Sequence, residues 1–200
     1  MLTDHSIKSR EKILQAAFTV LSQQGYENTS VKEIAEEAGV AQGLVHYHFK
    51  SKQLLVLAVL EFVCDKVELG LAGEAGALAA FEQTKQMLRD PENRDANALY
   101  VQLMGVGLHD PVIGNGVRTF ITAERTHIEE LARQVLNERE QLATPARGIA
   151  GVVWAAVLGI MIQGLVDPAF DTDEAIDTLA AMSLSAVFPS AARMDAAREA

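Results

Sequence analysis

One short segment of the chain carries the densest group of side chains able to read a DNA base. Gln42 and His46 stand four positions apart, so on a helix they share one face, which Gly43 and Tyr47 flank. A glutamine amide can form two hydrogen bonds with adenine, and Leu44 could meet a thymine methyl group. Glycine allows the backbone to approach a base edge closely. This composition predicts a helix that reads the major groove.

Hydroxyl and ammonium groups flank this segment on both sides. Such groups suit phosphate oxygens, which position a protein on DNA without reading its sequence. The candidates are Thr29, Ser30, Lys32, Lys50 and Lys52. Ser51 should cap the helix that follows it, and the free amides at the start of that helix would add a phosphate site.

Two short helices joined by a glycine must position these groups. Ser30 and Glu33 have the spacing of a capping box, which predicts the start of the first helix. Gly39 should end it, and Val45 and Phe49 then share the buried face of the second helix. Helix, tight turn and helix in this order are typical of a helix-turn-helix, whose second helix enters the major groove.

The rest of the chain also has the composition and hydrophobic spacing of helices. Only five of the 200 residues are prolines, and no segment alternates as a strand would. The sequence therefore predicts an all-α protein. Helices are expected over 6–24, 31–38, 42–49, 52–69, 77–89, 96–109, 111–140, 145–166 and 172–187.

The net charge of −10 is unusual for a protein that binds DNA, and it is unevenly distributed. Residues 1–55 hold six basic and six acidic side chains, so the whole excess lies in the remainder. A neutral DNA-binding part predicts weak non-specific affinity, because phosphate neutralisation supplies most of that affinity. Specific binding would then depend on a few base contacts doubled by dimerisation. A polar N-terminus without a secretory signal and a single cysteine, Cys64, favour a cytoplasmic location.

A long ordered run over about residues 8–57 resembles the N-terminal domain of the TetR family of bacterial repressors. It is R-E-K-I-L-x-A-A…G-Y-x-x-T-S-V-x-x-I-A-x-x-A-G-V-A-x-G-L-V-H-Y-H-F-x-S-K-x-x-L-L. The resemblance implies a homodimer that binds a palindromic double-stranded operator and is released by a small-molecule effector. It also implies the domain division, with a helix-turn-helix DNA-binding domain over 1–51, a helical ligand-binding and dimerisation domain over 52–188, and a tail over 189–200.

The resemblance also assigns roles by position. Gln42, Gly43 and Leu44 would face bases, and Thr29, Tyr47, His48 and Lys52 would contact or organise phosphates. Two residues depart from the family pattern. Ala41 stands where the family usually has a serine that caps the recognition helix, and losing such a cap costs about 1 kcal/mol. His46 stands where tyrosine is common, which makes its contact shorter and sensitive to pH.

An apolar segment over 148–162 is the best candidate for a subunit interface. Its 15 residues fall short of the roughly 20 that a membrane span needs, so we expect a buried helix and no membrane contact. The resemblance places the last two helices in a four-helix dimer interface, and the alternative is packing within one chain. The predicted interface residues are Gly151, Ala155, Gly159, Ile176, Leu179 and Ser183.

An effector cavity follows only from the resemblance, which places it among the helices from 52 to 166. The candidates to line it are large or polar side chains on otherwise apolar helices, and each could equally be plain core. They are Phe62, Tyr100, Met104, His109, Phe120, His127, Trp154 and Met161.

The sequence shows no catalytic motif, and we expect neither an enzyme nor a cofactor. His46 and His48 point in different directions on a helix, so no metal site is expected there. Cys64 is expected to be an inert buried thiol. Three alternatives to the ligand-released repressor remain open: an activator, a regulator that answers a protein partner, and an enzyme or carrier with a vestigial DNA-binding domain.

Overall fold

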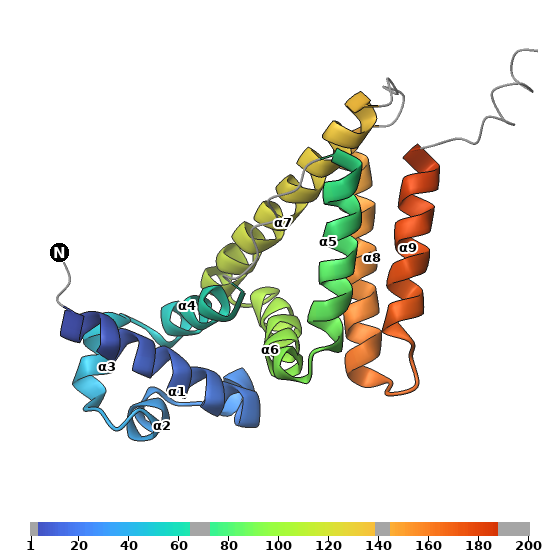
Figure 1. The fold of residues 1–200 in the computed structure, drawn as a ribbon. Coiled ribbons are helices and arrows are strands. Elements are labelled where there is room, and N and C mark those ends of the chain that lie inside the picture. The colour runs from blue at the N-terminus through green and yellow to red at the C-terminus, as the bar shows by residue number, and fades with distance from the viewer. Residues whose placement is uncertain (1–3, 65–72, 139–144, 188–200) are drawn as a thin grey trace, which may run out of the picture. The chain divides into compact units, whose positions relative to one another are not determined.

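The computed structural model describes residues 4–64, 73–138 and 145–187, and every regular element within these ranges is a helix (Figure 1). The predicted all-α fold is therefore confirmed. The helices are α1 (Asp4–Asn28), α2 (Val31–Glu37), α3 (Gln42–His48), α4 (Lys52–Cys64), α5 (Gly73–Arg89), α6 (Pro91–Gly107), α7 (Pro111–Glu138), α8 (Ala146–Val166) and α9 (Thr172–Val187). Residues 65–72, which include the end of the helix expected over 52–69, and the predicted tail over 189–200 lie outside the described residues.

Aspartate followed by proline starts two of these helices. Asp110 Oδ1 accepts the N–H groups of Val112 and Ile113 at 2.8 and 3.1 Å and so caps α7, which begins at residue 111 as expected. The same arrangement at Asp90, whose Oδ1 accepts the Glu92 N–H at 2.9 Å, starts α6 at residue 91 rather than at the predicted 96. The sequence analysis missed this second cap, although its residues carry the same signal.

The chain divides into two compact units, and neither is continuous in sequence. The first unit holds Met1–Val67 and Arg94–Phe120, and the second holds Glu68–Asn93 and Ile121–Ala200. Helices α6 and α7 therefore each contribute residues to both units. The first unit includes α4, which follows the domain boundary expected between residues 51 and 52. That boundary between two functional domains stays a prediction.

The first unit is built around α1, which packs against α2 and α4. Ile13, Leu14 and Leu21 of α1 are fully buried, together with Ile34 of α2 and Leu55 of α4. Full burial of one such aliphatic side chain stabilises a fold by about 1.5–3 kcal/mol. This core holds the helix-turn-helix in place against α1.

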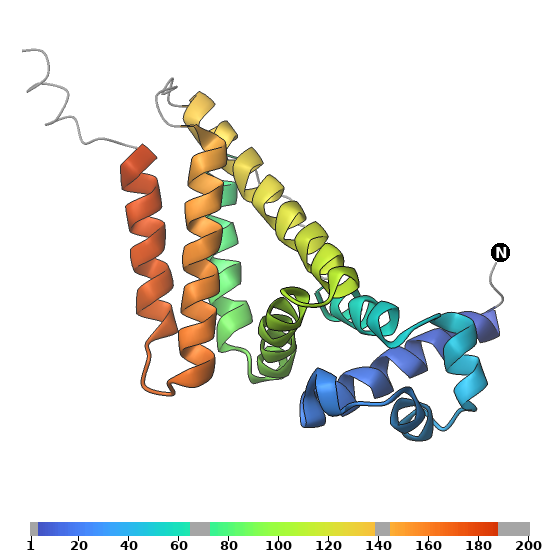
Figure 2. The same cartoon turned by 180° about the vertical axis from the view of Figure 1, so that it is seen from behind.

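The second unit contains a hairpin of α8 and α9, which lie side by side in both views (Figures 1 and 2). Val153, Val157 and Ile160 of α8 form its core with Ile176 of α9. The expectation that Ile176 lies at a dimer interface is not met, because its side chain is 1% exposed and fills the core of its own chain. An ion pair of 2.8 Å between Lys85 Nζ and Asp177 Oδ1 joins α5 to α9.

Helix α8 is longer than its purely apolar segment and has a mean hydropathy of 2.2 over its most apolar stretch. It is the one helix among the described residues with the length and composition to cross a membrane, a property that core helices of soluble proteins share. Only 28% of that stretch is buried within the chain, so α8 presents an apolar surface that its own protomer leaves uncovered.

Candidate nucleic-acid interface

Local capping shapes the first helix of the helix-turn-helix. Ser30 Oγ accepts the Glu33 N–H at 3.2 Å, and Glu33 Oε2 accepts the Ser30 N–H at 2.8 Å, which forms the predicted capping box. The hydrogen bonds from Ser30 lower the pKa of the Glu33 carboxyl. Gly39 follows α2 at a φ of 60°, a left-handed conformation that glycine adopts without strain. The chain can then turn sharply and begin α3 at Gln42.

The inner face of α3 is formed by the two residues expected there. Val45 is 1% exposed, and Phe49, which ends the helix, is also buried. The guanidinium carbon of Arg10 lies 5.3 Å from the centre of the Phe49 ring, so α1 adds a cation–π contact to this packing. Together these contacts hold α3 against α1 and α2 with its opposite face turned outward.

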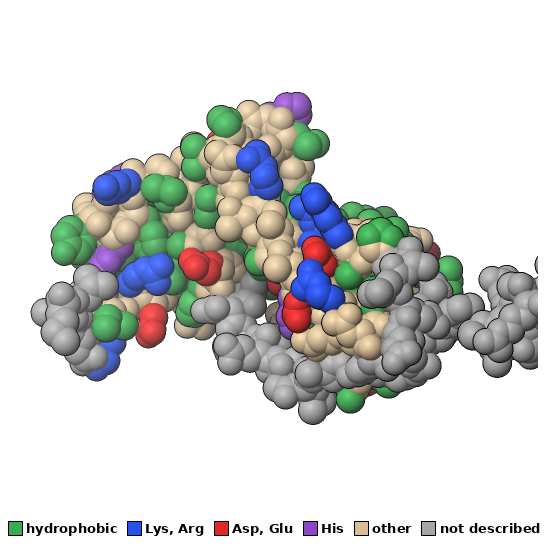
Figure 3. Space-filling model, turned by 90° about the horizontal axis from the view of Figure 1, so that it is seen from above, with side chains coloured by type: hydrophobic (Ala, Val, Ile, Leu, Met, Phe, Trp, Pro, Cys, Tyr) green, Lys and Arg blue, Asp and Glu red, His purple; other side chains and the backbone are tan. Residues whose placement is uncertain are grey.

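The outer face of α3 presents the side chains that the sequence assigned to DNA. Gln42, Gly43, His46 and Tyr47 are all exposed, and the Tyr47 side chain reaches 72%. No atom lies within 4 Å of where a Cβ on Gly43 would stand, so the backbone there is open to a ligand. Leu44 is half-buried at the edge of this surface. On the face shown in Figure 3, Lys, Arg and His side chains lie beside exposed hydrophobic ones over the N-terminal helices.

Helix α3 begins without a side-chain cap. Ala41 occupies the N-cap position in extended conformation and offers no hydrogen-bonding side chain. The Leu44 N–H instead bonds to the Ala41 carbonyl at 2.8 Å. The departure from the family pattern therefore leaves this short helix without the stabilisation that a serine there would add.

The three lysines assigned to phosphates have different surroundings. Lys32 and Lys50 are exposed, although Lys32 Nζ also lies 3.7 Å from the Glu36 carboxylate one helical turn away. The Lys52 ammonium lies 4.3 Å from the centre of the Tyr26 ring and is half-buried. Burial lowers its pKa, while the charges of nearby glutamates oppose that shift. Lys52 therefore packs against Tyr26 and also adds a positive charge to the surface.

Three further residues assigned to phosphates already form hydrogen bonds with other residues of the chain. Thr29 is 3% exposed and its hydroxyl donates to the Gly25 carbonyl at 2.7 Å, so it does not meet the expectation of a surface contact. The Ser30 hydroxyl donates to Glu33 at 2.7 Å as part of the capping box. His48 is half-buried, with its Nε2 lying 2.9 Å from Ser9 Oγ.

The environment of His48 favours its neutral form. Burial is the main cause of its lowered pKa, and the charge of Arg10 adds to the effect. A neutral imidazole has no charge to attract a phosphate. Its hydrogen bond to Ser9 instead fixes the end of α3 against α1. Sequence reasoning missed Ser9 and Arg10, because their partners stand 39 positions away and local spacing does not relate them.

The candidates for an effector cavity are divided between the two units. Phe62, Tyr100, Met104, His109 and Phe120 belong to the first unit, whereas His127, Trp154 and Met161 belong to the second. The rings of Tyr100 and Phe120 lie 4.9 Å apart edge to face, and Tyr100 and Met161 are buried. His109 and His127 are exposed, and Phe62 is 39% exposed. Their roles in ligand binding stay predictions.

Two polar groups in the second unit are candidates for contact with an effector. The Trp154 indole N–H is buried without a hydrogen-bond partner among the described residues. Glu124 is half-buried on α7, and burial raises the pKa of its carboxyl. The sequence analysis did not single out Glu124, because an acid on a charged helix usually faces solvent.

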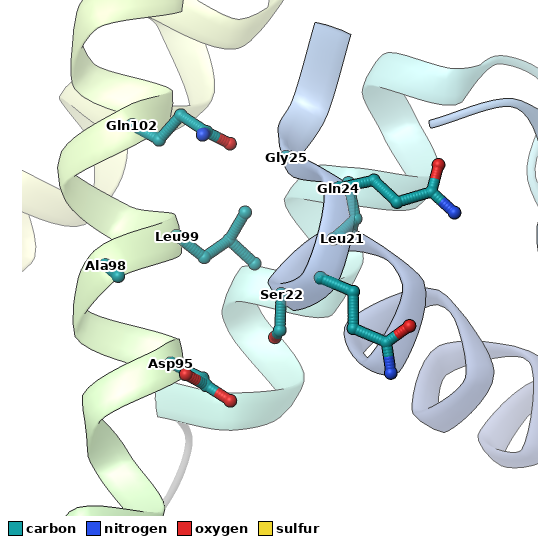
Figure 4. A pocket seen from close by; sticks show the side chains of 9 residues that line it. Leu21, Ser22, Gln24, Gly25, Asp95, Ala98, Leu99 and Gln102 are labelled. Atoms are coloured by element: carbon teal, nitrogen blue, oxygen red, sulfur yellow. The ribbon is translucent and has the colours of Figure 1, made fainter. Parts of the chain in front are cut away.

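A pocket lies within the first unit, between the end of α1 and α6 (Figure 4). Leu21 and Leu99 form its apolar lining, and Ser22, Asp95 and Gln102 are among its polar residues. The sequence analysis did not foresee this pocket, because it depends on how two helices far apart in the sequence cross.

The residues expected at a subunit interface fall into two groups. Gly151, Ala155 and Gly159 lie on a side of α8 where nothing packs within 4 Å of the glycines, whereas Leu179 and Ser183 of α9 are half-buried. Large apolar side chains beside the small ones are exposed, and they are Val152, Ile162, Val166 and Met182. The described residues contain no group of three or more His, Cys, Asp or Glu side chains that could hold a metal ion. The Cys64 side chain lies outside the described residues.

Comparison with known proteins matches the N-terminal helices to one family. Residues 13–59 match the model of the bacterial regulatory proteins of the tetR family. The chain is 24% identical to the HTH-type transcriptional regulator CymR of Pseudomonas putida over 166 residues. The matched segment covers 81% of this chain and 82% of the relative. The chain spans only about a fifth to a quarter of the length of several other curated relatives that it matches.

Solved structures share the fold over most of the chain. A transcriptional regulator from Rhodococcus sp. Rha1 is 24% identical with a TM-score of 0.71, covering 88% of this chain and 96% of that chain. FadR from Bacillus subtilis, a transcriptional regulator solved in complex with stearoyl-CoA, is 14% identical with a TM-score of 0.69 over 88% and 97% of the two chains. At these identities the likeness establishes the shared helical fold.

Proposed function

We propose that this chain, a member of the TetR family of bacterial transcriptional regulators, is a homodimeric repressor that a small-molecule effector releases from a palindromic operator. The observation that carries the proposal is the outer face of α3. Its side chains can read bases, yet none of its exposed residues is needed to pack the helix. The protein would act in the cytoplasm, where its DNA lies, and we propose no catalytic activity.

Base reading would rest on the first half of α3. Gln42 can form two hydrogen bonds with adenine, Leu44 can contact a thymine methyl group, and Gly43 allows a close approach. His46 and Tyr47 extend the same surface. Lys32, Lys50 and Lys52 would bind phosphates and fix the register, and His48 would keep the helix end in place.

Dimerisation would double these few contacts. The exposed apolar side chains on α8 and α9, next to small residues on α8, support a close helix pairing between two protomers. Two recognition helices about 34–36 Å apart would then enter successive major grooves on one side of the duplex. An interface there would cover the apolar surface that α8 leaves open.

An effector would act by binding one conformation better than another. Trp154 supports a ligand with a hydrogen-bond acceptor, because a buried indole N–H without a partner costs free energy that such a ligand would recover. The stearoyl-CoA complex of FadR is a precedent for a protein of this fold that binds a small molecule. The half-buried Glu124 would favour an effector that carries a hydrogen-bond donor or a positive charge.

Selection of binding sites from a random DNA library tests the proposal. The wild-type chain should enrich a palindrome, and Gln42→Ala should weaken binding to it by about thirtyfold or more, since a good bidentate base contact is worth about 1–3 kcal/mol and the dimer loses two of them. Gln86→Ala on α5 is the matched control, because Gln86 is also an exposed helical glutamine. A reporter placed behind the selected site then distinguishes repression from activation. The absence of any enriched site, or equal binding by Gln42→Ala and wild type, would contradict this model of DNA recognition.

A further inference from the structure

The end of α1 is joined to α6 by one hydrogen bond between residues far apart in the sequence. Gly25 has a φ of 77°, which interrupts regular helix geometry, and the next residue, Tyr26, donates its backbone N–H to Gln102 Oε1 at 2.8 Å. Figure 4 shows the Gln102 side chain extending from α6 toward Gly25. A Cβ on Gly25 would stand 2.8 Å from Gln102 Nε2, so glycine is what allows this approach.

Tyr26 connects that hydrogen bond to the start of α4. Its ring is buried and carries the Lys52 ammonium on its face at 4.3 Å. Lys52 is the first residue of α4, which follows the recognition helix almost directly. Gln53 adds a parallel link, because its Nε2 donates to Asp110 Oδ2 at 3.3 Å, at the turn between α6 and α7.

The backbones of α1 and α6 approach each other less extensively than those of α1 and its neighbours α2 and α4. The extensive helix contacts of α1 are with α2 and α4, and α6 is not among them. The pocket beside Gln102 leaves part of the space between α1 and α6 unfilled. Where packing is incomplete, a directional hydrogen bond has more influence on how two helices are oriented.

We propose that Gln102 is a positioning residue for DNA binding, which orients the helix-turn-helix against α6 and thereby limits the half-site spacing that the dimer accepts. The reason is geometric. In a dimer the separation of the two recognition helices depends on every contact that orients each helix-turn-helix within its protomer. Gln102 is on α6 and not on the outer face of α3, so it would affect spacing without touching a base. This inference rests on the dimeric operator binding proposed above.

Two variants of Gln102 separate the hydrogen bond from the bulk of the side chain. Gln102→Leu keeps a similar volume but removes the acceptor, whereas Gln102→Glu keeps an acceptor oxygen at the same distance from the backbone. The probe is the palindrome that the wild-type chain selects, together with versions whose centre is one or two base pairs longer or shorter. Fluorescence anisotropy measures the affinity for each DNA. NMR detection of hydrogen–deuterium exchange measures how fast the Tyr26 amide exchanges with solvent.

The wild type and Gln102→Glu should lose about tenfold or more in affinity for each shifted spacing, because each recognition helix then misses its groove. Gln102→Leu should lose less than about threefold, with Tyr26 amide exchange at least about tenfold faster, because a freed helix-turn-helix can adjust. An identical spacing profile in Gln102→Leu and wild type would overturn the proposal, as would unchanged exchange at Tyr26. If the wild type selects no palindrome, the proposed function fails instead, and the exchange measurement still tests the Gln102 contact.

Discussion

Gly25 and Gly43 both lie in helical segments, but their backbones and surroundings give them different roles. The backbone of Gly25 has a positive φ, and the Gln102 amide packs directly beside it. Gly43 lies in regular helix with open space where a side chain would stand. The first glycine is needed by the fold. The second is a position where the fold would accept a side chain, and where the proposed mode of DNA recognition brings the backbone close to a base.

Substitution of each glycine by alanine should therefore have opposite effects on stability. Gly25→Ala should lower the free energy of unfolding by about 1–2 kcal/mol, since a left-handed backbone is costly for a residue with a Cβ. Gly43→Ala should raise it by about 0.5–1 kcal/mol, because alanine favours helix more than glycine does. Urea unfolding followed by circular dichroism measures both. A stabilised Gly43→Ala that also binds the selected operator more weakly would support close backbone approach at this position, and unchanged binding would contradict it.

His48 should make stability depend on pH. Its pKa is lowered in the folded protein by burial and then by Arg10, so the unfolded chain takes up a proton at higher pH than the folded one. The stabilisation is complete above the ordinary pKa of 6.5 and is lost as the pH falls from there through the folded value. Urea unfolding of the wild type at pH 7.5, 6.5 and 5.5 should show this decrease, and His48→Gln should reduce it. His46→Gln, on the exposed face of the same helix, is the control for placing a glutamine in α3.

At the scale of the element, α2 and α3 form a natural comparison. Both have seven residues, but Ser30 caps α2 with its side chain and Ala41 offers α3 none. Helices this short depend on tertiary contacts, because their own hydrogen bonds do not offset the cost of nucleation. For α3 those contacts are Val45 and Phe49, with Arg10 and Ser9 from α1.

Ala41→Ser should therefore stabilise the protein. The extended backbone at Ala41 already suits an N-cap, so a serine there should add about 1 kcal/mol to the free energy of unfolding. Ser30→Ala should remove a similar amount, since it deletes an existing cap. Both variants are compared with the wild type by urea unfolding. A loss of stability in Ala41→Ser would show that the start of α3 has no room for a capping hydroxyl.

At the scale of the whole molecule, the exposed surface of α8 is the feature that a single protomer leaves unexplained. Val152 and Val166 are 69% and 77% exposed, although they are apolar and lie on a mostly apolar helix. Such a contiguous surface is typical of a subunit interface. The dimer proposed here would bury it.

Val152→Glu should therefore disrupt the dimer. In a symmetric interface each substitution occurs twice, and a buried unpaired charge on each side should raise the dimer dissociation constant by about a hundredfold or more. Sedimentation equilibrium measures the change. Leu108→Glu is the control, because Leu108 is even more exposed but lies after α6 and not on α8 or α9. Equal effects of both substitutions, or of neither, would place the interface elsewhere.

Much of the fold was predictable from the sequence because its signals are local. The capping box at Ser30 and Glu33, the glycine turn at Gly39 and the cap at Asp110 each depend on residues a few positions apart. The missed start of α6 at Asp90 is an error of the same local kind. The candidate effector residues were different. Tyr100 packs on Phe120 and Met161 is buried in a core, and no spacing rule distinguishes such residues from a ligand contact.

The sequence by itself determined the helices, their caps and the outward face of the recognition helix, because helical periodicity and capping act within a few residues. The tertiary structure decided which polar side chains are already occupied. It places His48 against Ser9 and brings Gln102 to Tyr26, contacts that depend on how helices cross. Hydroxyl, imidazole and amide groups look equally available in a sequence. Only packing determines whether each one meets solvent, DNA or another part of its own chain.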